Sequence, residues 1–191
     1  MVLTMAQLDA YYAACAPAIG ASTIAAIVKV ESGGNPWAIN DNTTRRTFGA
    51  RTYREAVGIA SNLVRIGHSV DMGLTQVNSR NLARVGMTIG EVLEPCRNLM
   101  AAARILTDCY LLAAARYGEG QGALVHALGC YNTGSLYAGK RYVARVLAAA
   151  LGRPVVRAMD RAGLKARIPA RQTPSPIVVN WPQAMDWRVF R

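Results

Sequence analysis

Glu31 is the residue of this sequence whose surroundings best suit acid–base chemistry. It lies in the segment ASTIAAIVKVESGGNPW, where Ser22 is a predicted helix N-cap. Ile24, Ile27 and Val28 share one face of that helix. The next position on this apolar face is Glu31, and the sequence GGNP then ends the helix. The pattern therefore predicts an acid in the last turn of a helix, on the side that faces the core.

Both features of this position favour the protonated form of the Glu31 carboxyl. Partial burial disfavours the charged form, and the negative end of the helix dipole opposes ionisation. A carboxylic acid that keeps its proton near neutral pH is what general acid catalysis requires. The alternative is a frayed helix end, with Glu31 in solvent.

Polar side chains gather in a second segment, DMGLTQVNSRNL, from Asp71 to Leu82. Its amide and hydroxyl groups, among them those of Gln76 and Asn78, suit a ligand rich in hydroxyl and acetamido groups. The alternative is a helix N-terminus capped by Asn78 or Ser79.

Two further segments combine an aromatic residue with polar groups. The first is CYNTGS, from Cys130 to Ser135, which predicts an aromatic side chain beside a turn. The second is KRYVARVL, where Tyr142 shares a helix face with Val146. The alternative for Tyr142 is an ordinary core tyrosine.

The elements that must position these residues are helices. Apolar spacing is helical almost throughout, and no period-2 strand of useful length is present, so the fold class is mainly α. Helices are expected over Thr4–Ala14, Ser22–Glu31, Thr52–Ile66, Arg80–Val85, Ile89–Leu93, Cys96–Tyr117, Gly122–Leu128 and Lys140–Leu151.

Composition indicates one folded domain with an anionic partner. The chain has 191 residues, 52% of them hydrophobic, and a net charge of +11. Nucleic acid, anionic lipid and an acidic cell wall are the candidate partners. The alternative is genomic codon bias, since 19 of the 22 basic residues are arginine.

The chain divides into two regions. Residues 1–152 are expected to form the compact helical domain. Residues 153–191 carry a net charge of +6 and five of the eight prolines, which is typical of a flexible basic tail. Trp181 and an apolar cluster at residues 185–190 could dock on a partner or fold back on the domain.

The cysteines and apolar runs exclude two classes of protein. Cys15, Cys96, Cys109 and Cys130 form no CxxC pair and have no histidine at metal-ligand spacing, so no metal site is expected. Disulfides and buried thiols both remain open. No apolar run is long enough for a transmembrane segment, and no secretory signal is recognisable at the start of the chain.

Taken together and in order, these segments resemble the catalytic domain of the soluble lytic transglycosylases, relatives of goose-type lysozyme. VESGGNP resembles the Glu-Ser motif of the family, GLTQVN its GLMQ motif and CYNTGS its AYNAG motif. Tyr142 in RYVARV matches the tyrosine of the closing motif. The resemblance covers residues 8–151 and implies a lysozyme-like fold.

The resemblance also implies an activity that needs no cofactor. Glu31 would protonate the glycosidic oxygen between MurNAc and GlcNAc in peptidoglycan, then take a proton from the C6 hydroxyl, which closes a 1,6-anhydro ring. One carboxylate serves the family for both steps. Tyr142 would orient Glu31. The remaining substrate contacts implied are Ser32, Gln76, Asn78, Tyr131 and Asn132.

Further details are similar to the transglycosylase component of type IV secretion systems, although a pilus, type III or phage relative is an alternative. These details are ESGGNPWAI, VNSRNL, EPCRNL, DCY and the cysteine before YNTG. Thr75 and Thr133 depart from the common Met and Ala of the family. The branch implies a periplasmic protein whose signal has been removed, secretion-system partners for the tail, and disulfides Cys109–Cys130 and Cys15–Cys96.

Other functions give different expectations. A hydrolytic muramidase would differ only in its product, and a non-catalytic peptidoglycan-binding scaffold would keep the fold without the reaction. A DNA-binding protein is the third alternative, since SRNLARVGMTIGEVLEP faintly resembles a helix-turn-helix. It leaves Glu31 on an apolar face unexplained, so no nucleic-acid partner is expected.

Overall fold

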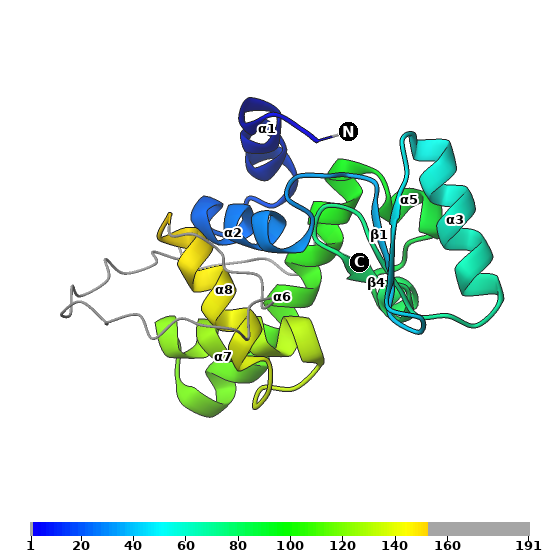
Figure 1. Cartoon of the computed structure of the whole chain (residues 1–191). Coiled ribbons are helices and arrows are strands. Elements are labelled where there is room, and N and C mark those ends of the chain that lie inside the picture. The colour runs from blue at the N-terminus through cyan, green and yellow to red at the C-terminus, as the bar shows by residue number, and fades with distance from the viewer. Residues whose placement is uncertain (1, 153–191) are drawn as a thin grey trace, which may run out of the picture.

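The computed structural model describes residues 2–152 and confirms a mainly α fold (Figure 1). The predicted tail, residues 153–191, lies outside the described residues. The helices are α1 (Met5–Cys15), α2 (Ala21–Glu31), α3 (Tyr53–Arg65), α4 (Leu82–Val85), α5 (Ile89–Val92), α6 (Pro95–Tyr117), α7 (Gln121–Thr133) and α8 (Lys140–Ala150), with a 3-10 turn η1 (Ser79–Asn81) before α4. The strands are β1 (Ala38–Asp41), β2 (Arg46–Gly49), β3 (Val70–Met72) and β4 (Val77–Asn78).

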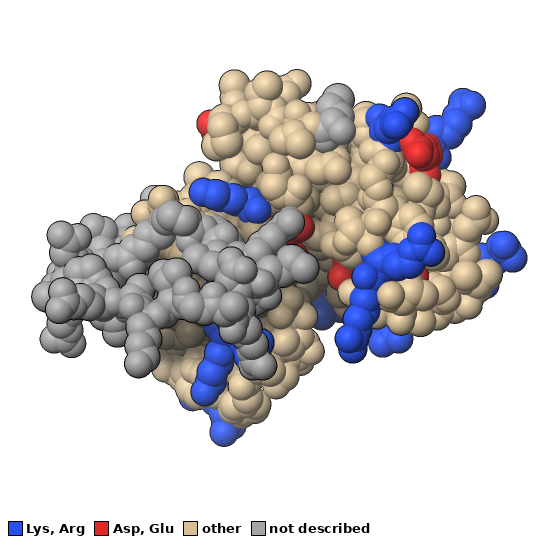
Figure 2. Space-filling model, viewed as in Figure 1, with Lys and Arg blue, Asp and Glu red and all other residues tan. Residues whose placement is uncertain are grey.

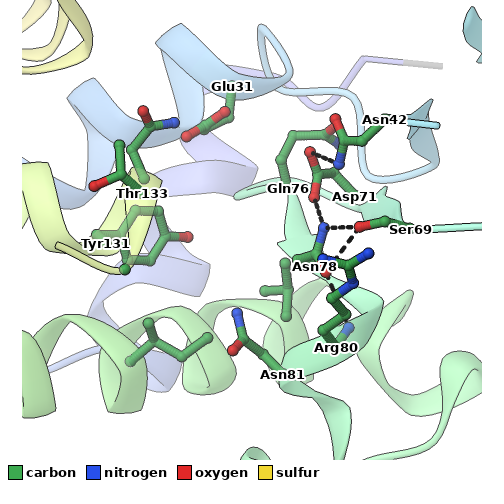
Figure 3. A pocket seen from close by; sticks show the side chains of 14 residues that line it. Glu31, Asn42, Ser69, Asp71, Gln76, Asn78, Arg80, Asn81, Tyr131 and Thr133 are labelled. Atoms are coloured by element: carbon green, nitrogen blue, oxygen red, sulfur yellow. Dashed lines mark hydrogen bonds between the residues drawn. The ribbon is translucent and has the colours of Figure 1, made fainter. Parts of the chain in front are cut away.

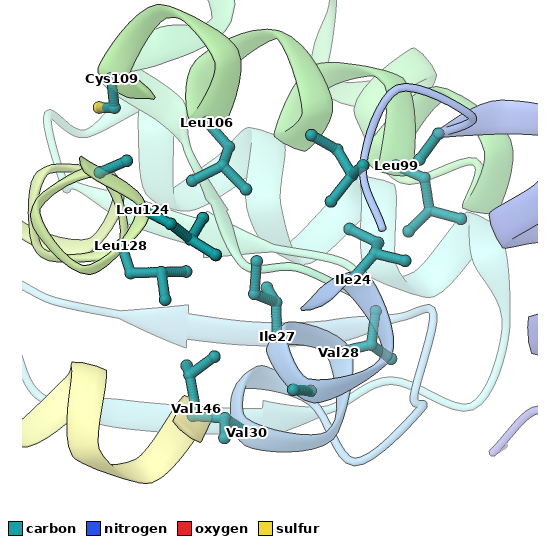
Figure 4. Packing of buried hydrophobic residues seen from close by; sticks show 14 of the residues in the cluster. Ile24, Ile27, Val28, Val30, Leu99, Leu106, Cys109, Leu124, Leu128 and Val146 are labelled. Carbon is teal, nitrogen blue, oxygen red and sulfur yellow. The ribbon is translucent and has the colours of Figure 1, made fainter. Parts of the chain in front are cut away.

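One apolar core joins α1, α2, α6, α7 and α8. The predicted face of α2 is its centre, because Ile24, Ile27 and Val28 are buried and pack against leucines of α6 and α7 (Figure 4). Removing apolar surface of this extent from water is the main stabilising contribution to such a core. The packing fixes the axis of α2 and therefore the place of its last residue, Glu31.

A small antiparallel sheet has a second core. The strand order is β2-β1-β3-β4, and the first half of α6, together with α3 and α5, packs against it. On β3, Val70 and Met72 are fully buried, so Asp71 between them points to the opposite face. Asp71 pairs in register with Asn40 of β1 and Asn78 of β4.

Asn98 of α6 attaches the turn between β3 and β4 to the helices. Its side-chain nitrogen donates to the carbonyls of Met72 and Val92 at 2.9 and 2.7 Å, and its oxygen accepts from the amide and hydroxyl of Thr75. Gly73 has a φ of 80°, and a Cβ there would lie 2.3 Å from the Asn98 amide. A glycine at position 73 is therefore required for Asn98 to approach.

Two disulfides join the outer helices to α6. Cys15 of α1 bonds Cys96, and Cys109 bonds Cys130 of α7, with Cα separations of 5.3 and 5.8 Å. The pairing implied by the family resemblance is confirmed.

Three details of the expected elements were wrong. Ser22 is not the N-cap of α2, which begins after Gly20 without a side-chain cap. The helix expected to end at Leu128 continues to Thr133, so most of CYNTGS is helical and the turn comes at Gly134. The sheet was not expected at all.

Across residues 2–152, every helix falls short of the length and apolarity that a membrane span needs.

Candidate active site

A polar cavity of about 500 Å³ lies between the helical core and the sheet. Figure 3 shows Glu31, Tyr131 and Thr133 on one side, and Asp71, Asn78 and Arg80 on the other. Figure 2 shows acidic side chains in the hollow in the middle of this face, with Lys and Arg side chains around it. Its lining residues are Glu31, Asn42, Ser69, Asp71, Gln76, Val77, Asn78, Arg80, Asn81, Ile105, Tyr131, Asn132, Thr133 and Gly134.

Glu31 lies where the sequence places it, as the final residue of α2. Ser32 caps the helix, and Gly33 and Gly34 then turn the chain away with φ values of 62° and 86°. The half-buried Glu31 side chain enters the cavity from the end of a helix whose other residues are fixed in the core.

Burial raises the pKa of the Glu31 carboxyl to about 7. The nearby hydroxyl of Tyr142 lowers this pKa, the Asp71 carboxylate raises it, and the Arg145 guanidinium lowers it, each by less than burial does. Near neutral pH the group is thus poised between its two forms, so it can both donate and accept a proton.

Tyr142 of α8 is buried beside Glu31 and does not line the cavity. Within the described residues its hydroxyl has no hydrogen bond of ordinary geometry. It nevertheless approaches the Glu31 carboxyl closely enough to lower the pKa of that group. Tyr142 is therefore a core tyrosine that also approaches the acid, and its role in orienting Glu31 stays a prediction.

Tyr131 connects the helices to the sheet. Its hydroxyl donates to the carbonyl of Thr75 at 2.8 Å, and its ring lies 6.4 Å from that of Tyr142. Because it packs against both apolar cores, Tyr131 sets the distance between the two walls of the cavity.

Arg145 of α8 contacts the end of α2 directly. Its Nη2 donates to the carbonyl of Val30 at 2.9 Å, while its buried Nε has no partner among the described residues. A cation at a helix C-terminus interacts favourably with the dipole, and this one also lies near Glu31.

Gln76 lines the cavity with an amide that is already bonded. Its nitrogen donates to the carbonyls of Gly73 and Ala38 at 2.8 and 3.1 Å, and its oxygen accepts from Asn40 at 2.6 Å. The backbone of Gln76 has a φ of 52°, which is uncommon for a residue other than glycine. These bonds hold the turn after β3 against β1.

Asn78 and Asp71 form one hydrogen-bonded group with Ser69. The Asn78 nitrogen donates to Asp71 at 2.6 Å and to Ser69 at 2.9 Å, and its oxygen accepts from the amide of Arg80. Asn78 thus caps η1, as one interpretation of the sequence expected, and it also lines the cavity, where a substrate contact stays a prediction. Asn42 completes the group by donating to the other oxygen of Asp71 at 2.8 Å.

The remaining predicted contacts differ in position. Asn132 is exposed and lines the cavity, next to Tyr131. Ser32 does not line it, because its hydroxyl bonds the carbonyl of Val28 and the amide of Gly34. A substrate contact by Ser32 stays a prediction.

Several lining residues were not singled out from the sequence. Asp71 and Ser69 lie on or before β3, and Asn42 follows β1, so they meet only when the sheet forms. The available signal was the carboxylate at the start of DMGLTQVN.

No candidate metal site is present in residues 2–152. They contain no group of three or more His, Cys, Asp or Glu side chains that could hold an ion.

A half-buried acid at a helix end, facing a small sheet across a polar cavity, defines a lysozyme-like protein with a glycosidase-type site. The chain belongs to the transglycosylase SLT domain family, whose model matches residues 10–145. The family membership confirms the fold expected from the sequence motifs.

Curated relatives agree with this assignment. The chain is 39% identical over 150 residues to protein virB1 of Rhizobium radiobacter. The aligned residues cover 78% of this chain and 62% of the relative. This chain is 38% identical over 144 residues to type IV secretion system protein virB1 of Brucella abortus, covering 71% and 60%. The chain thus spans about three fifths of the length of these relatives. The comparison with solved structures gave no significant match.

Proposed function

We propose that this protein is a peptidoglycan lytic transglycosylase, which cleaves the β-1,4 bond between MurNAc and GlcNAc. The observation that carries the proposal is the Glu31 carboxyl, held in a polar cavity at the end of a core helix with a pKa of about 7. Membership of the transglycosylase SLT domain family supports the same reaction.

The reaction requires two proton transfers through Glu31. The protonated carboxyl donates to the glycosidic oxygen, the bond from that oxygen to C1 of MurNAc breaks, and GlcNAc leaves with the electron pair and the proton. The Glu31 carboxylate then takes the proton of the C6 hydroxyl, and the oxygen of that hydroxyl bonds C1 of MurNAc. The products are a 1,6-anhydroMurNAc end and a regenerated acid.

Five of the other predicted site residues divide into two groups, while Ser32 lies outside the cavity lining. Asn132, Asn78 and Tyr131 line the cavity and would contact the sugar chain. Gln76 and Tyr142 would be positioning residues, since Gln76 holds the turn after β3 and Tyr142 approaches the Glu31 carboxyl from the core.

Product analysis tests this function. Purified sacculi would be digested with the protein, and the released muropeptides measured by mass spectrometry. Anhydro ends are expected. Reducing ends would identify a hydrolytic muramidase, and no release would identify a binding scaffold, so either result would contradict the proposal.

We also propose a periplasmic site of action in support of type IV secretion. Peptidoglycan lies outside the inner membrane, and both disulfides among the described residues suit an oxidising compartment. The relative from Brucella abortus is itself a type IV secretion system protein by name. Four free thiols in protein prepared from the periplasm would contradict this placement.

The division of the chain at residue 152 is a further part of the proposal. Residues 1–152 would carry catalysis, and the basic tail would contact anionic wall or secretion components. A truncation after Gly152 is expected to keep its turnover of soluble glycan fragments and to bind intact sacculi more weakly at low salt. Unfolding of the truncated protein would show that the tail belongs to the domain.

A further inference from the structure

The cavity contains a second carboxylate that the one-acid mechanism leaves without a role. Asp71 and Glu31 both line it, from β3 and from the end of α2 (Figure 3). Asp71 lies on a central strand, between Val70 and Met72, which are fully buried. A charged side chain at such a position is unfavourable unless its charge is compensated.

The compensation comes from amide donors. Asn42 donates to one oxygen of Asp71 at 2.8 Å and Asn78 to the other at 2.6 Å. Donors to both oxygens favour the ionised carboxylate and fix its orientation. Glu31, by contrast, is approached by the hydroxyl of Tyr142 and lies near the guanidinium of Arg145. The two carboxyls therefore differ in their hydrogen-bond partners, since Asp71 has a fixed amide donor at each oxygen.

We propose that Asp71 is a second catalytic carboxylate, which stays ionised and stabilises the positive charge that develops on the sugar ring as Glu31 donates its proton. This inference rests on the proposed function. Asp71 forms no covalent bond in this scheme, because the C6 oxygen of the substrate still closes the ring on C1. Its contribution is electrostatic, and it comes from a carboxylate that Asn42 and Asn78 hold in place before the reaction.

The other charges around the cavity leave this role to Asp71. In the described residues, Arg80 is the one cation in the lining, and Arg145 approaches Glu31 from α8. Neither can stabilise a developing cation. Burial raises the pKa of Asp71 above its ordinary value, and the bonds from Asn42 and Asn78 limit that rise. The Asp71 charge in turn raises the pKa of Glu31, which favours the protonated form that Glu31 needs as an acid.

The alternative is that Asp71 only ties the strands together through Asn42 and Asn78. The two roles separate in the variant Asp71→Asn, which keeps the size of the side chain and removes its charge. Asp9→Asn, on the exposed surface of α1, is the matched control with the same change in net charge.

Kinetics on soluble glycan fragments, as a function of pH, decide between them. We expect kcat of Asp71→Asn to fall about 100-fold with little change in KM, because the lost interaction forms in the transition state. The alkaline limb of kcat/KM should move to lower pH, since the charge that raises the pKa of Glu31 is gone. Asp71→Glu should recover part of the rate, and Asp9→Asn should match the parent.

A kcat of Asp71→Asn within threefold of the parent, with an unmoved pH limb, would overturn the inference and leave the proposed function intact. A parent that releases no anhydro product would instead remove the proposed function. If thermal unfolding shows that Asp71→Asn does not fold, Asp71→Ser with added formate replaces it. Recovery of at least about tenfold by formate is expected there, and no recovery would overturn the inference.

Discussion

At the scale of single residues, the proposed reaction requires Glu31 to donate a proton in one step and accept one in the next. Those tasks require a pKa close to the working pH, which a solvated glutamate does not have. Burial at the end of α2 raises the pKa of Glu31 to about 7, and the guanidinium of Arg145 limits the rise. The site thus obtains one bifunctional group from its surroundings.

The first prediction concerns the pH dependence of catalysis. Because the acid form of Glu31 begins the reaction, kcat/KM should fall about tenfold per pH unit above pH 7. An NMR titration of the Glu31 side chain in the free protein should give a pKa near 7. A pKa below the ordinary glutamate value of about 4.3 would contradict the buried environment.

The second prediction concerns Arg145, which we expect to be a positioning residue. Arg145→Gln removes a cation that favours the Glu31 carboxylate, so the pKa of Glu31 and the alkaline limb of kcat/KM should both move upward. Arg145→Lys should restore most of the parental pH profile because it keeps the charge. An unchanged profile in the glutamine variant would confine Arg145 to holding the carbonyl of Val30.

Local sequence was sufficient for the part of the site built on one helix. Glu31 was predictable because its apolar face and the following glycines are neighbours in sequence. Asp71 and Asn42 were not, because they come together through strand pairing across 29 residues. Asn78 was recognised, but its partner Asp71 could only be identified from the folded sheet.

At the scale of elements, Asn98 is the joint between the sheet and α6. In a fully buried environment, its side chain bonds three backbone groups, those of Met72, Thr75 and Val92, and also the hydroxyl of Thr75. Loss of these bonds would free the turn that carries Gln76 and displace the wall of the cavity that holds Asp71.

The third prediction follows from this joint. Asn98→Ala should lower the free energy of unfolding by about 3 kcal/mol, since it leaves buried donors and acceptors without partners. Denaturant unfolding measures the change. Asn62→Ala, at an exposed position of α3, is the control and should change stability by less than about 0.5 kcal/mol. Equal effects of the two substitutions would contradict the role of Asn98.

The prediction of helices succeeded where the helical pattern of apolar residues extended over several turns. The helices over α1, α2, α3, α6 and α8 were placed within two residues because each shows several turns of one pattern. The strands were missed because they have two to four residues, too few to show alternation. The end of α7 was missed because YNTG is typical of a turn, while the Cys109–Cys130 bond and helix packing keep Cys130–Thr133 helical.

At the scale of the whole molecule, α6 is the element that the others share. It packs against α7, α1 and α5, and both disulfides end on it. The cavity therefore lies between two cores with a common central helix, so its two walls keep a fixed spacing.

The fourth prediction compares the two disulfides. The Cys15–Cys96 bond spans 81 residues and Cys109–Cys130 spans 21. In the chain-entropy view, removing the longer loop by a double alanine substitution should cost about 1 kcal/mol more than removing the shorter one. Denaturant unfolding of the two double variants gives the difference. The opposite order would show that native contacts, rather than loop length, dominate.

The variant Glu31→Gln needs a control on folding before its activity is interpreted. A raised pKa in the native state contributes stability that is fully present at acid pH and is lost as the pH rises through about 7. Glutamine has no ionisable group, so the variant does not lose this stability as the pH rises. Glu31→Gln should therefore unfold at the same or a higher temperature than the parent at pH 8.

The most direct test of the whole account is the rate at which Glu31→Gln releases soluble muropeptides from purified peptidoglycan. Because one carboxyl performs both proton transfers, we predict a rate at least about 1000-fold below that of the parent, from a protein with an intact fold. A folded variant that retained about a tenth of the parental rate would show that another group supplies the proton, and the assignment of Glu31 would be wrong.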